Sequence, residues 1–367
     1  MPEPTDAPED EPMPEDMPEP PTPEVLVEAV LAALEETPYE FERFLLGVER
    51  RGPLHEDPGR YRRAVGIALY ELWQPLGRVV DFKRPELVIR LAVDDRGAPQ
   101  ISFESRALYL YGRYRKLERG ISQARWLCMS CQGRGCRRCD GAGRHYTRSV
   151  QEEIGRVLGP AFGSTGLPSL HAAGREDVDV LMLGQGRPFV LEIPEPVQRS
   201  GDFRALERRV AEASGGAVEI QGLCRTDSDA PKRVKDLRAD KSYRALCQPT
   251  SEGAPLPDEA AVAALTEAFT GRLIEQKTPT RVAHRRADLV RRRTVRELAL
   301  VGREDEGLVF RIRAEAGTYI KELVSGDEGR TVPSLSAEAG VELVCARLDV
   351  LDIHAEDAAT LNPPAAS

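Results

Sequence analysis

Residues 174–193 read GREDVDVLMLGQGRPFVLEI, with two apolar runs, VDVLML and RPFVLEI, on either side of the tripeptide GQG. Two apolar runs around a glycine turn are typical of a β-hairpin. Arg175 and Asp177 stand directly before the first run. A carboxylate just before a strand can project into a cleft from a rigid mount, and a neighbouring arginine can keep it ionised. We therefore predict a hairpin here, with Asp177 at its entrance as a candidate for catalysis.

The sequence on the N-terminal side of this hairpin has both helical and strand patterns. Apolar residues recur at helical spacing in residues 25–36 and 61–77, and alternating strand patterns follow in residues 85–95 and 101–112. This succession predicts a compact α+β domain over residues 25–127.

The sequence on the C-terminal side is dominated by strand patterns, which predict a second domain over residues 149–360. A second hairpin is expected at residues 297–315, where ELALV and LVFRIRAE flank GREDEG. A helix is expected at residues 260–276 and a last strand at residues 341–353. The whole chain is therefore predicted to be of the α+β class, and residues 361–367 to be a frayed tail.

The net charge of the 367 residues is −9, and an N-terminal tail accounts for it. Residues 1–24 contain nine acidic residues, nine prolines and no Lys or Arg, so that 60 − 9 = 51 acidic residues face 51 basic residues in the remainder. A segment of this composition cannot bury enough apolar surface to offset the entropy of ordering, so we predict a disordered tail.

The sequence shows no pattern of a membrane span or of a secretory signal. The sequence has no run of about 18 apolar residues, so we predict neither a membrane span nor a membrane partner. The acidic, proline-rich N-terminus does not resemble a secretory signal, and we expect a cytoplasmic protein.

Four cysteines form a pair of CxxC motifs in CMSCQGRGCRRCDGAG, residues 128–143. The spacing C-x2-C-x4-C-x2-C lets four thiolates close a tetrahedron around Zn²⁺, with no open coordination position. We therefore predict a structural zinc unit over residues 128–148, bound by Cys128, Cys131, Cys136 and Cys139. The motif CxxCxGxG also occurs in DnaJ-type chaperones, but those usually have four repeats and an HPD loop, whereas this chain has two repeats and no HPD.

Two basic runs flank the zinc unit. Residues 276–296 hold eight Lys or Arg and one Asp, and they include Arg281, Arg285 and Arg286. Residues 106–119 place Arg113, Arg115 and Lys116 among three tyrosines. Basic side chains interleaved with aromatics suit a charged backbone with stackable bases, so we predict contacts with RNA; a solvated helix face is the alternative.

The tetrapeptide GRED occurs twice, at residues 174–177 and 302–305. The second copy lies between two strands and ends in a glycine, which favours an exposed turn for Asp305. Tyr243, Ile320 and Lys321 follow in KSYRALC and GTYIKE. Since no phosphate-binding or dinucleotide fingerprint is present, we expect no organic cofactor.

GREDVDV, KSYRAL and GTYIKE, in this order, resemble the three catalytic motifs of pseudouridine synthases. The strings LYGRYRKLERGISQARW and TPTRVAHRRADLVRRR, with the paired CxxC motifs, narrow the resemblance to the archaeal Pus-ten family of tRNA pseudouridine synthases.

This resemblance implies an N-terminal THUMP-type RNA-binding domain and a C-terminal synthase domain with a mixed, mainly antiparallel sheet. The implied reaction converts uridine 54 or 55 in the T-arm of tRNA to pseudouridine, and no obligate protein partner is expected. Leu181 stands where the family usually has an arginine.

The resemblance also implies a role for each matched residue. Asp177 is the nucleophile, Tyr243 stacks on the flipped base, and Lys321 lies near the aspartate. Ile320 and Leu348 are apolar walls of the pocket, and Arg175 joins them in binding the substrate. A non-catalytic RNA-binding protein is the alternative, although it would not need Asp177, Tyr243 and Lys321 together.

Overall fold

The computed structural model describes residues 18–49, 52–54, 57–251, 253–285, 287–304 and 307–355, without the side chains of residues 284 and 285. Most of the predicted N-terminal tail and all of the predicted C-terminal tail lie outside these residues. The chain divides into two compact units. The smaller unit contains residues 1–107, 161–166 and 194–200, and the larger unit contains residues 108–160, 167–193 and 201–367.

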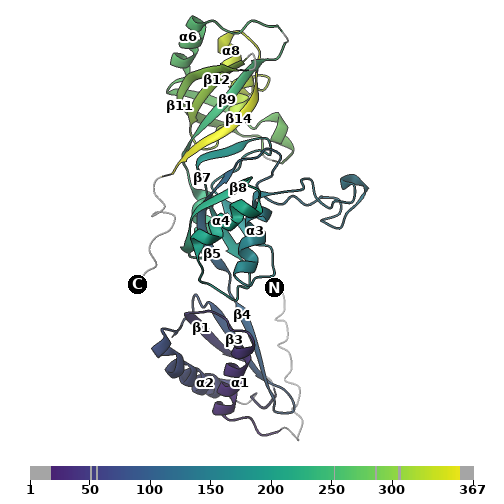
Figure 1. Ribbon diagram of the computed structural model, residues 1–367, viewed down its shortest axis with the longest axis vertical. Coiled ribbons are helices and arrows are strands. Elements are labelled where there is room, and N and C mark those ends of the chain that lie inside the picture. The colour runs from purple at the N-terminus through teal and green to yellow at the C-terminus, as the bar shows by residue number, and fades with distance from the viewer. Residues whose placement is uncertain are drawn as a thin grey trace, which may run out of the picture. The chain divides into compact units, whose positions relative to one another are not determined.

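The smaller unit is a four-stranded sheet in the order β2-β1-β3-β4, accompanied by two helices (Figure 1). Its elements are α1 (Pro23–Glu36), β1 (Arg43–Val48), α2 (Pro58–Trp73), β2 (Val79–Val80), β3 (Leu87–Val93) and β4 (Pro99–Ser105). Asp57 caps α2 by accepting a hydrogen bond of 2.9 Å from the backbone N–H of Arg60. Trp73 packs edge-on against Phe41 and Phe44 in the core. The two helices and the first strand predicted for this region are confirmed, whereas residues 101–112 are divided between β4 of this unit and β5 (Leu108–Lys116) of the larger unit.

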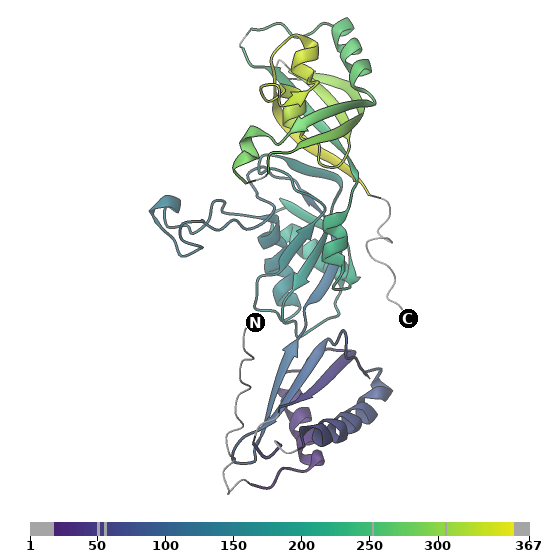
Figure 2. The same ribbon diagram turned by 180° about the vertical axis from the view of Figure 1, so that it is seen from behind.

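The larger unit is built on a ten-stranded sheet in the order β13-β10-β11-β12-β9-β14-β7-β5-β8, with β6 paired to β7 (Figures 1 and 2). Its strands are β5 (Leu108–Lys116), β6 (Ser169–Ala172), β7 (Leu181–Ile193), β8 (Val218–Thr226), β9 (Asp240–Pro249), β10 (Arg272–Lys277), β11 (Val290–Glu304), β12 (Gly307–Ala314), β13 (Thr331–Val332) and β14 (Leu343–His354). Its helices are α3 (Val150–Ala161), α4 (Phe203–Ala213), α5 (Ala230–Asp236), α6 (Glu259–Phe269), α7 (Ile320–Ser325) and α8 (Leu335–Ala339).

The pairing of β14 with β7 is parallel, and the other pairings described in this sheet are antiparallel. The expected mixed, mainly antiparallel sheet of an α+β protein is therefore present. Asp349 lies opposite Leu181 in the parallel pair, so the loop that precedes β7 emerges beside β14.

The hairpin predicted at residues 178–193 is wrong, because β7 runs from Leu181 to Ile193 as one strand. Gly184 (φ +55°) and Gly186 (φ +76°) bend the strand instead of reversing it. A Cβ on Gly186 would lie 2.6 Å from the carbonyl oxygen of Tyr114, so the glycine allows β5 to approach closely. The second half of β7 pairs antiparallel with β5, and not with the first half of β7 as in a hairpin.

Three further expectations concern boundaries. β11 and β12 form the second predicted hairpin, although residues 305 and 306, and with them Asp305, lie outside the described residues. The helix expected at residues 260–276 ends early: α6 stops at Phe269, and β10 begins after Gly271, whose φ is +78°. The boundary between the two units falls after Ala107 and not near residue 127, because β5 pairs with β7 and β8. Within the described residues, no helix is long and apolar enough to cross a membrane.

Candidate active site and cysteine cluster

An open cavity of about 1040 Å³ lies in the larger unit. Its walls come from the loop before β7 (residues 173–180), from β9 and β14, from the start of α7 and from the 3-10 helix Thr280–Arg285. Seven residues that the sequence predicted for the site line it: Arg175, Asp177, Tyr243, Arg281, Ile320, Lys321 and Leu348. The fold therefore brings segments more than a hundred residues apart to one cavity.

Asp177 lies between two cations. Its Oδ2 atom is 2.9 Å from an Nη of Arg281 and 3.7 Å from Nζ of Lys321. Lys321 also contacts Asp179 at 2.7 Å, and although burial acts to raise the pKa of Asp179, the hydrogen bond and charge of Lys321 lower it. Both cations therefore lie within 4 Å of the Asp177 carboxyl group. Arg281 was predicted to bind RNA, and in the structure it pairs with this carboxylate.

The backbone of the loop is held by Lys116. Its Nζ atom donates to the carbonyl oxygens of Ile121 (2.8 Å), Asp177 (3.0 Å) and Val178 (3.2 Å). Burial lowers the pKa of Lys116, whose side chain is 0% exposed. The predicted contact between Lys116 and RNA is therefore wrong, because a fully enclosed ammonium cannot reach a phosphate. Lys116 positions Asp177 instead.

Glu176, the residue before Asp177, anchors the loop through contacts inside the protein. Its carboxylate pairs at 2.8 Å with Arg187, and both side chains are almost fully buried. The hydroxyl of Tyr114 lies 2.9 Å from each carboxylate oxygen, and Gln123 donates to that hydroxyl and to the carbonyl of Gly174. Buried charges of this kind are stable only when they are paired and hydrogen-bonded, as these are.

Tyr243 lines the floor of the cavity from β9 and is 7% exposed. Burial raises its pKa to about 12, so the phenol stays protonated at neutral pH. Lys241 lies on the same face of β9, because side chains alternate along a strand. Burial, followed by the charge of Arg187, lowers the pKa of Lys241 to about 8. Leu348 and Ile320 add apolar walls, as predicted for these positions.

Several predicted RNA contacts lie away from the cavity. Arg113 and Arg115 are on the face of β5 opposite Tyr114, and they bind the backbone of residues 185, 186 and 353 and the carboxylate of Glu219. Arg286 and the side chain of Arg285 lie outside the described part of the chain. The guanidinium carbon of Arg175 lies 4.9 Å from the centroid of the Trp126 ring.

The sequence did not point to Glu322, Arg187 or Gln123, and it placed Tyr114 in an RNA-binding run, whereas this side chain is fully buried. Glu322 accepts from Arg281 at 2.6 Å and so fixes the cation that pairs with Asp177. Arg187 offered one hint, since it is the single charged residue at the start of an apolar run. The partners of the others are distant in sequence, and no local pattern predicts such contacts.

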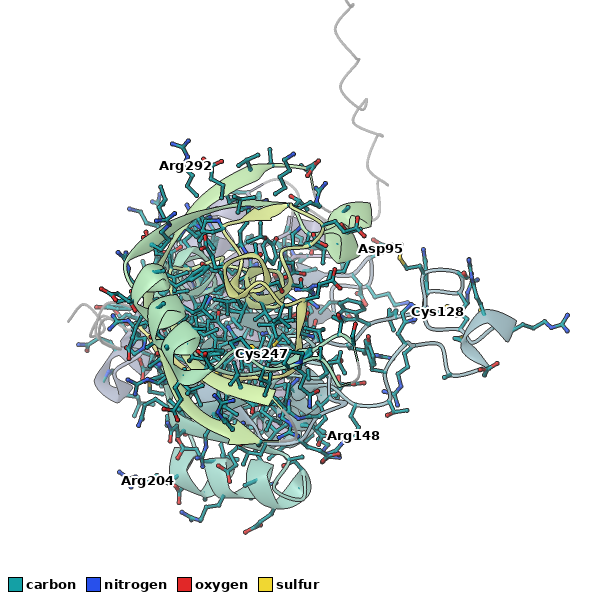
Figure 3. All side chains as sticks on the ribbon, turned by 90° about the horizontal axis from the view of Figure 1, so that it is seen from above. Asp95, Cys128, Arg148, Arg204, Cys247 and Arg292 are labelled. Atoms are coloured by element: carbon teal, nitrogen blue, oxygen red, sulfur yellow. The ribbon has the colours of Figure 1, made fainter. Side chains whose placement is uncertain are left out.

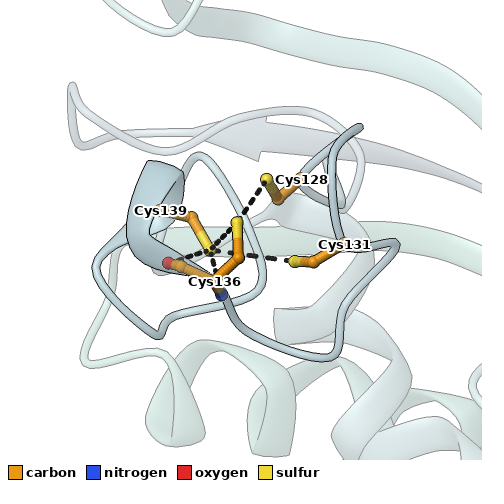
Figure 4. Close-up of side chains that lie close together, drawn as sticks. All are labelled: Cys128, Cys131, Cys136 and Cys139. Atoms are coloured by element: carbon orange, nitrogen blue, oxygen red, sulfur yellow. Dashed lines mark hydrogen bonds between the residues drawn. The ribbon is translucent and has the colours of Figure 1, made fainter.

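The four predicted zinc ligands meet in an arm, residues 127–146, that extends from the larger unit (Figures 1 and 3). Figure 4 shows their sulfur atoms turned toward one another, with distances of 3.7 to 3.9 Å for three of the pairs. A tetrahedron with Zn–S bonds of about 2.3 Å has sulfur atoms about 3.8 Å apart, so the cluster fits the ion. Its ligands would be Cys128, Cys131, Cys136 and Cys139.

Glycines allow the tight path around the sulfur atoms. Gly135 and Gly143 have positive φ, and a Cβ on Gly143 would lie 2.4 Å from the carbonyl oxygen of Gly133. The backbone N–H of Gly143 also lies 3.1 Å from the sulfur of Cys139. The second half of each CxxCxGxG unit is therefore needed to close the arm.

Comparisons with known proteins bear on the whole chain. The family model described as Pus10, C-terminal, matches residues 109–354. The tRNA pseudouridine synthase Pus10 of Methanopyrus kandleri is 38% identical over 354 residues, which cover 88% of this chain and 77% of that protein. The tRNA pseudouridine synthase Pus10 of Archaeoglobus fulgidus is 39% identical over 326 residues, covering 86% and 88% respectively. A solved structure, a Cbf5-Nop10-Gar1 complex, aligns at a TM-score of 0.32 and 19% identity over 52% of this chain and 42% of that one.

Proposed function

This chain belongs to the Pus10 family and is an RNA pseudouridine synthase, and we propose that it isomerises uridine 54, uridine 55 or both in the T-arm of tRNA, with Asp177 as the nucleophile. The observation that carries the proposal is the position of Asp177 in the cavity, paired with Arg281 and Lys321 and mounted on a loop fixed by Lys116. These contacts orient the side chain of Asp177, which is 37% exposed in the cavity and accessible to a nucleotide.

In the proposed reaction Asp177 forms a bond to C1′ of the nucleotide, and the electron pair of the C1′–N1 bond leaves with the uracil. The uracil rotates and rejoins through C5, while Asp177 leaves C1′. The proton on C5 is then lost and N1 gains one, so the product is an isomer of the substrate. Tyr243, which stays protonated at neutral pH, stacks on the base while the C1′–N1 bond is broken.

The target base must leave its stack before Asp177 can reach C1′. Extruding a nucleotide costs a few kcal/mol, and stacking on an aromatic ring returns about 1–3 kcal/mol. Contacts between arginines and phosphates supply further free energy. The substrate is thus a folded RNA held over a large surface, with one base inserted into the cavity.

The smaller unit and the arm have supporting roles in this proposal. The smaller unit, which contains two helices and a four-stranded sheet, is proposed to be a THUMP-type domain that binds the tRNA outside the T-arm. The arm is proposed to hold a structural Zn²⁺ ion, since four thiolates leave no coordination position for a substrate.

The deciding experiment replaces Asp177 with asparagine, which removes the nucleophile but keeps the shape of the side chain. We expect Asp177→Asn to bind tRNA normally and to lose on the order of 10³-fold or more in pseudouridine formation. Asp305→Asn, in the second GRED, is the matched control and should remain active. Asp179→Asn should lose less than Asp177→Asn, since it removes only a partner of Lys321.

The product is mapped at single-nucleotide resolution on unmodified transcripts in which uridine 54 or uridine 55 is replaced by cytidine. A transcript that still forms pseudouridine at its one remaining uridine identifies that position as a target of the enzyme. A fully active Asp177→Asn variant, or product only outside the T-arm, would contradict the proposal.

A further inference from the structure

A second set of aromatic and basic side chains lies at the edge of the cavity, where the arm leaves the larger unit. Trp126 and Tyr146 meet edge to face with their ring centroids 5.8 Å apart, and the guanidinium of Arg175 lies 4.9 Å from the Trp126 centroid. All three residues line the cavity that contains Asp177. The two rings are half-buried and Arg175 is exposed, so part of this surface is open to a ligand.

The arm itself sets the position of this cluster. Trp126 lies two residues before Cys128, and its carbonyl oxygen accepts a hydrogen bond of 3.0 Å from the N–H of His145. Leu127 and Arg144 form a β-bridge, and the N–H of Cys128 donates to the carbonyl of Gly143 at 2.8 Å. The two chain segments that carry Trp126 and Tyr146 are therefore hydrogen-bonded to each other at the base of the arm, next to the cysteine cluster.

The proposed reaction creates a need for such a surface. Extrusion of the target uridine leaves the adjacent base without a stacking partner on one side. Aromatic rings and guanidinium planes are the protein groups that stack on unpaired RNA bases, and they do so without requiring a particular base.

We infer that Trp126, Tyr146 and Arg175 form a stacking subsite for the nucleotide base next to the extruded uridine. The inference rests on the proposed function, because it takes the ligand to be an RNA with one flipped nucleotide. Arg175 lies two residues before Asp177, so the subsite and the nucleophile share one loop. The base next to the extruded uridine would therefore be held while Asp177 acts on that uridine.

The charge of the arm agrees with an RNA ligand at this place. Arg134, Arg137 and Arg138 are exposed on the arm beyond the subsite. A phosphate backbone that passes along these arginines would carry its bases past Trp126, since positive charge tracks the backbone while aromatic rings take the bases.

The fluorescence of tryptophan provides a direct test, because the chain contains only two tryptophans. Trp73 is 3% exposed and packed between aromatic rings in the smaller unit, so no base can stack on it. We expect an unmodified tRNA transcript to quench the fluorescence of the Asp177→Asn variant. The double variant Asp177→Asn/Trp126→Phe should show no such quenching, and the difference between the two isolates the signal of Trp126.

The identity of the ligand group follows from transcripts with one abasic nucleotide beside uridine 54 or 55. One abasic position should abolish the quenching of Trp126 and raise the Kd about 5- to 100-fold, the range expected for loss of one stacked base. Trp126→Ala should raise the Kd for intact tRNA by a similar factor, and Trp126→Phe, which keeps a ring, should restore most of the affinity. For the transcript that lacks the stacked base, Trp126→Ala should have no further effect.

Three results would overturn the inference. Quenching that survives every abasic substitution would show that Trp126 meets the backbone and not a base. Unchanged binding of intact tRNA by Trp126→Ala would show that no ligand stacks there. An equal loss by Trp126→Ala on intact and abasic transcripts would show a purely structural role. None of these readouts requires catalysis, so they remain distinct from failure of the proposed reaction, which the product map on the wild-type enzyme reveals.

Discussion

The arm and the loop that carries Asp177 are both irregular segments with defined geometry, but they are held in different ways. The arm's four sulfur ligands lie between residues 128 and 139, so every part of the cluster is local in sequence. The loop at residues 173–180 is held by Tyr114, Lys116, Gln123, Arg187 and Arg281, which come from three other regions of the chain. A local cluster can fold or unfold independently of the rest of the unit, whereas the structure of the loop depends on the assembled sheet.

The difference has an energetic consequence. In the proposed zinc-bound state, metal–thiolate bonds would hold the arm, and loss of the metal need not disturb the sheet. The loop is held by charges inside the protein, where a charge that loses its partner is very costly. Substitutions at the buried charges should therefore change the stability of the larger unit more than substitutions in the cysteine cluster.

The largest effect is expected for Glu176→Gln. The substitution leaves the guanidinium of Arg187, which is 1% exposed, without its carboxylate. Breaking a buried ion pair in this way costs about 3–5 kcal/mol, and we expect a loss of this size in the free energy of unfolding, measured by denaturant titration. The matched control is Glu304→Gln in the second GRED, where Glu304 is 36% exposed and pairs with Arg244 and Arg347.

The control should cost less than about 1 kcal/mol, because exposed ion pairs contribute little. Similar losses in the two variants would show that burial does not distinguish the two copies of the tetrapeptide, and the contrast would fail at its strongest point. Glu176→Gln should also reduce pseudouridine formation, since Glu176 anchors the loop next to Asp177.

The same contrast explains what the sequence could predict. The cysteine cluster was predicted completely because the ligand spacing within 12 residues determines the geometry. Asp177, Tyr243 and Lys321 were found through a resemblance of short motifs, and the structure brings all three to one cavity. The buried partners of the loop were not predicted, because their contacts are created by pairings such as β5 with β7, which leave no periodic pattern in either strand.

The hairpin expected at residues 178–193 was wrong for a related reason. A glycine pair between apolar runs has the same local signature whether the chain reverses or only bends. Gly186 is required by the close approach of Tyr114 on β5, a residue about 70 positions earlier in the chain. The α+β class and the three predicted helices are confirmed apart from their ends, since they depend on local periodicity, whereas α3, α4, α5, α7 and α8 were not predicted.

An intermediate effect, of opposite sign, is expected for Lys241→Met. Because burial and Arg187 lower the pKa of Lys241 from 10.5 to about 8, the folded protein holds this proton less tightly than the unfolded chain. Below pH 8 the ammonium is charged in both states, and the folded state bears the full cost of burying it. As pH rises from 8 to about 10.5, the unfolded chain binds more protons than the folded protein, and stability rises.

Removing the ammonium should therefore stabilise the protein at pH 7 by up to about 3 kcal/mol. The gain should shrink between pH 8 and 10.5 and disappear above this range, as followed by denaturant titration at several pH values. Lys277→Met, at an exposed position of β10, is the control and should show no such pH dependence. A gain that does not change with pH would show that Lys241 is not held at a cost to the fold.

The smallest effect on the larger unit is expected for the cysteine cluster. Elemental analysis should find about one zinc per chain, and Cys128→Ser should lose it, whereas Cys224→Ser, outside the arm, should keep it. Because the ligands are local, loss of the metal should expose residues 127–146 to proteolysis while changing the free energy of unfolding of the larger unit by less than about 1 kcal/mol. The tRNA affinity should nevertheless fall, since the arm fixes Trp126 and Tyr146. A loss of stability as large as that of Glu176→Gln would mean that the arm supports the sheet, and the two segments would then not be independent.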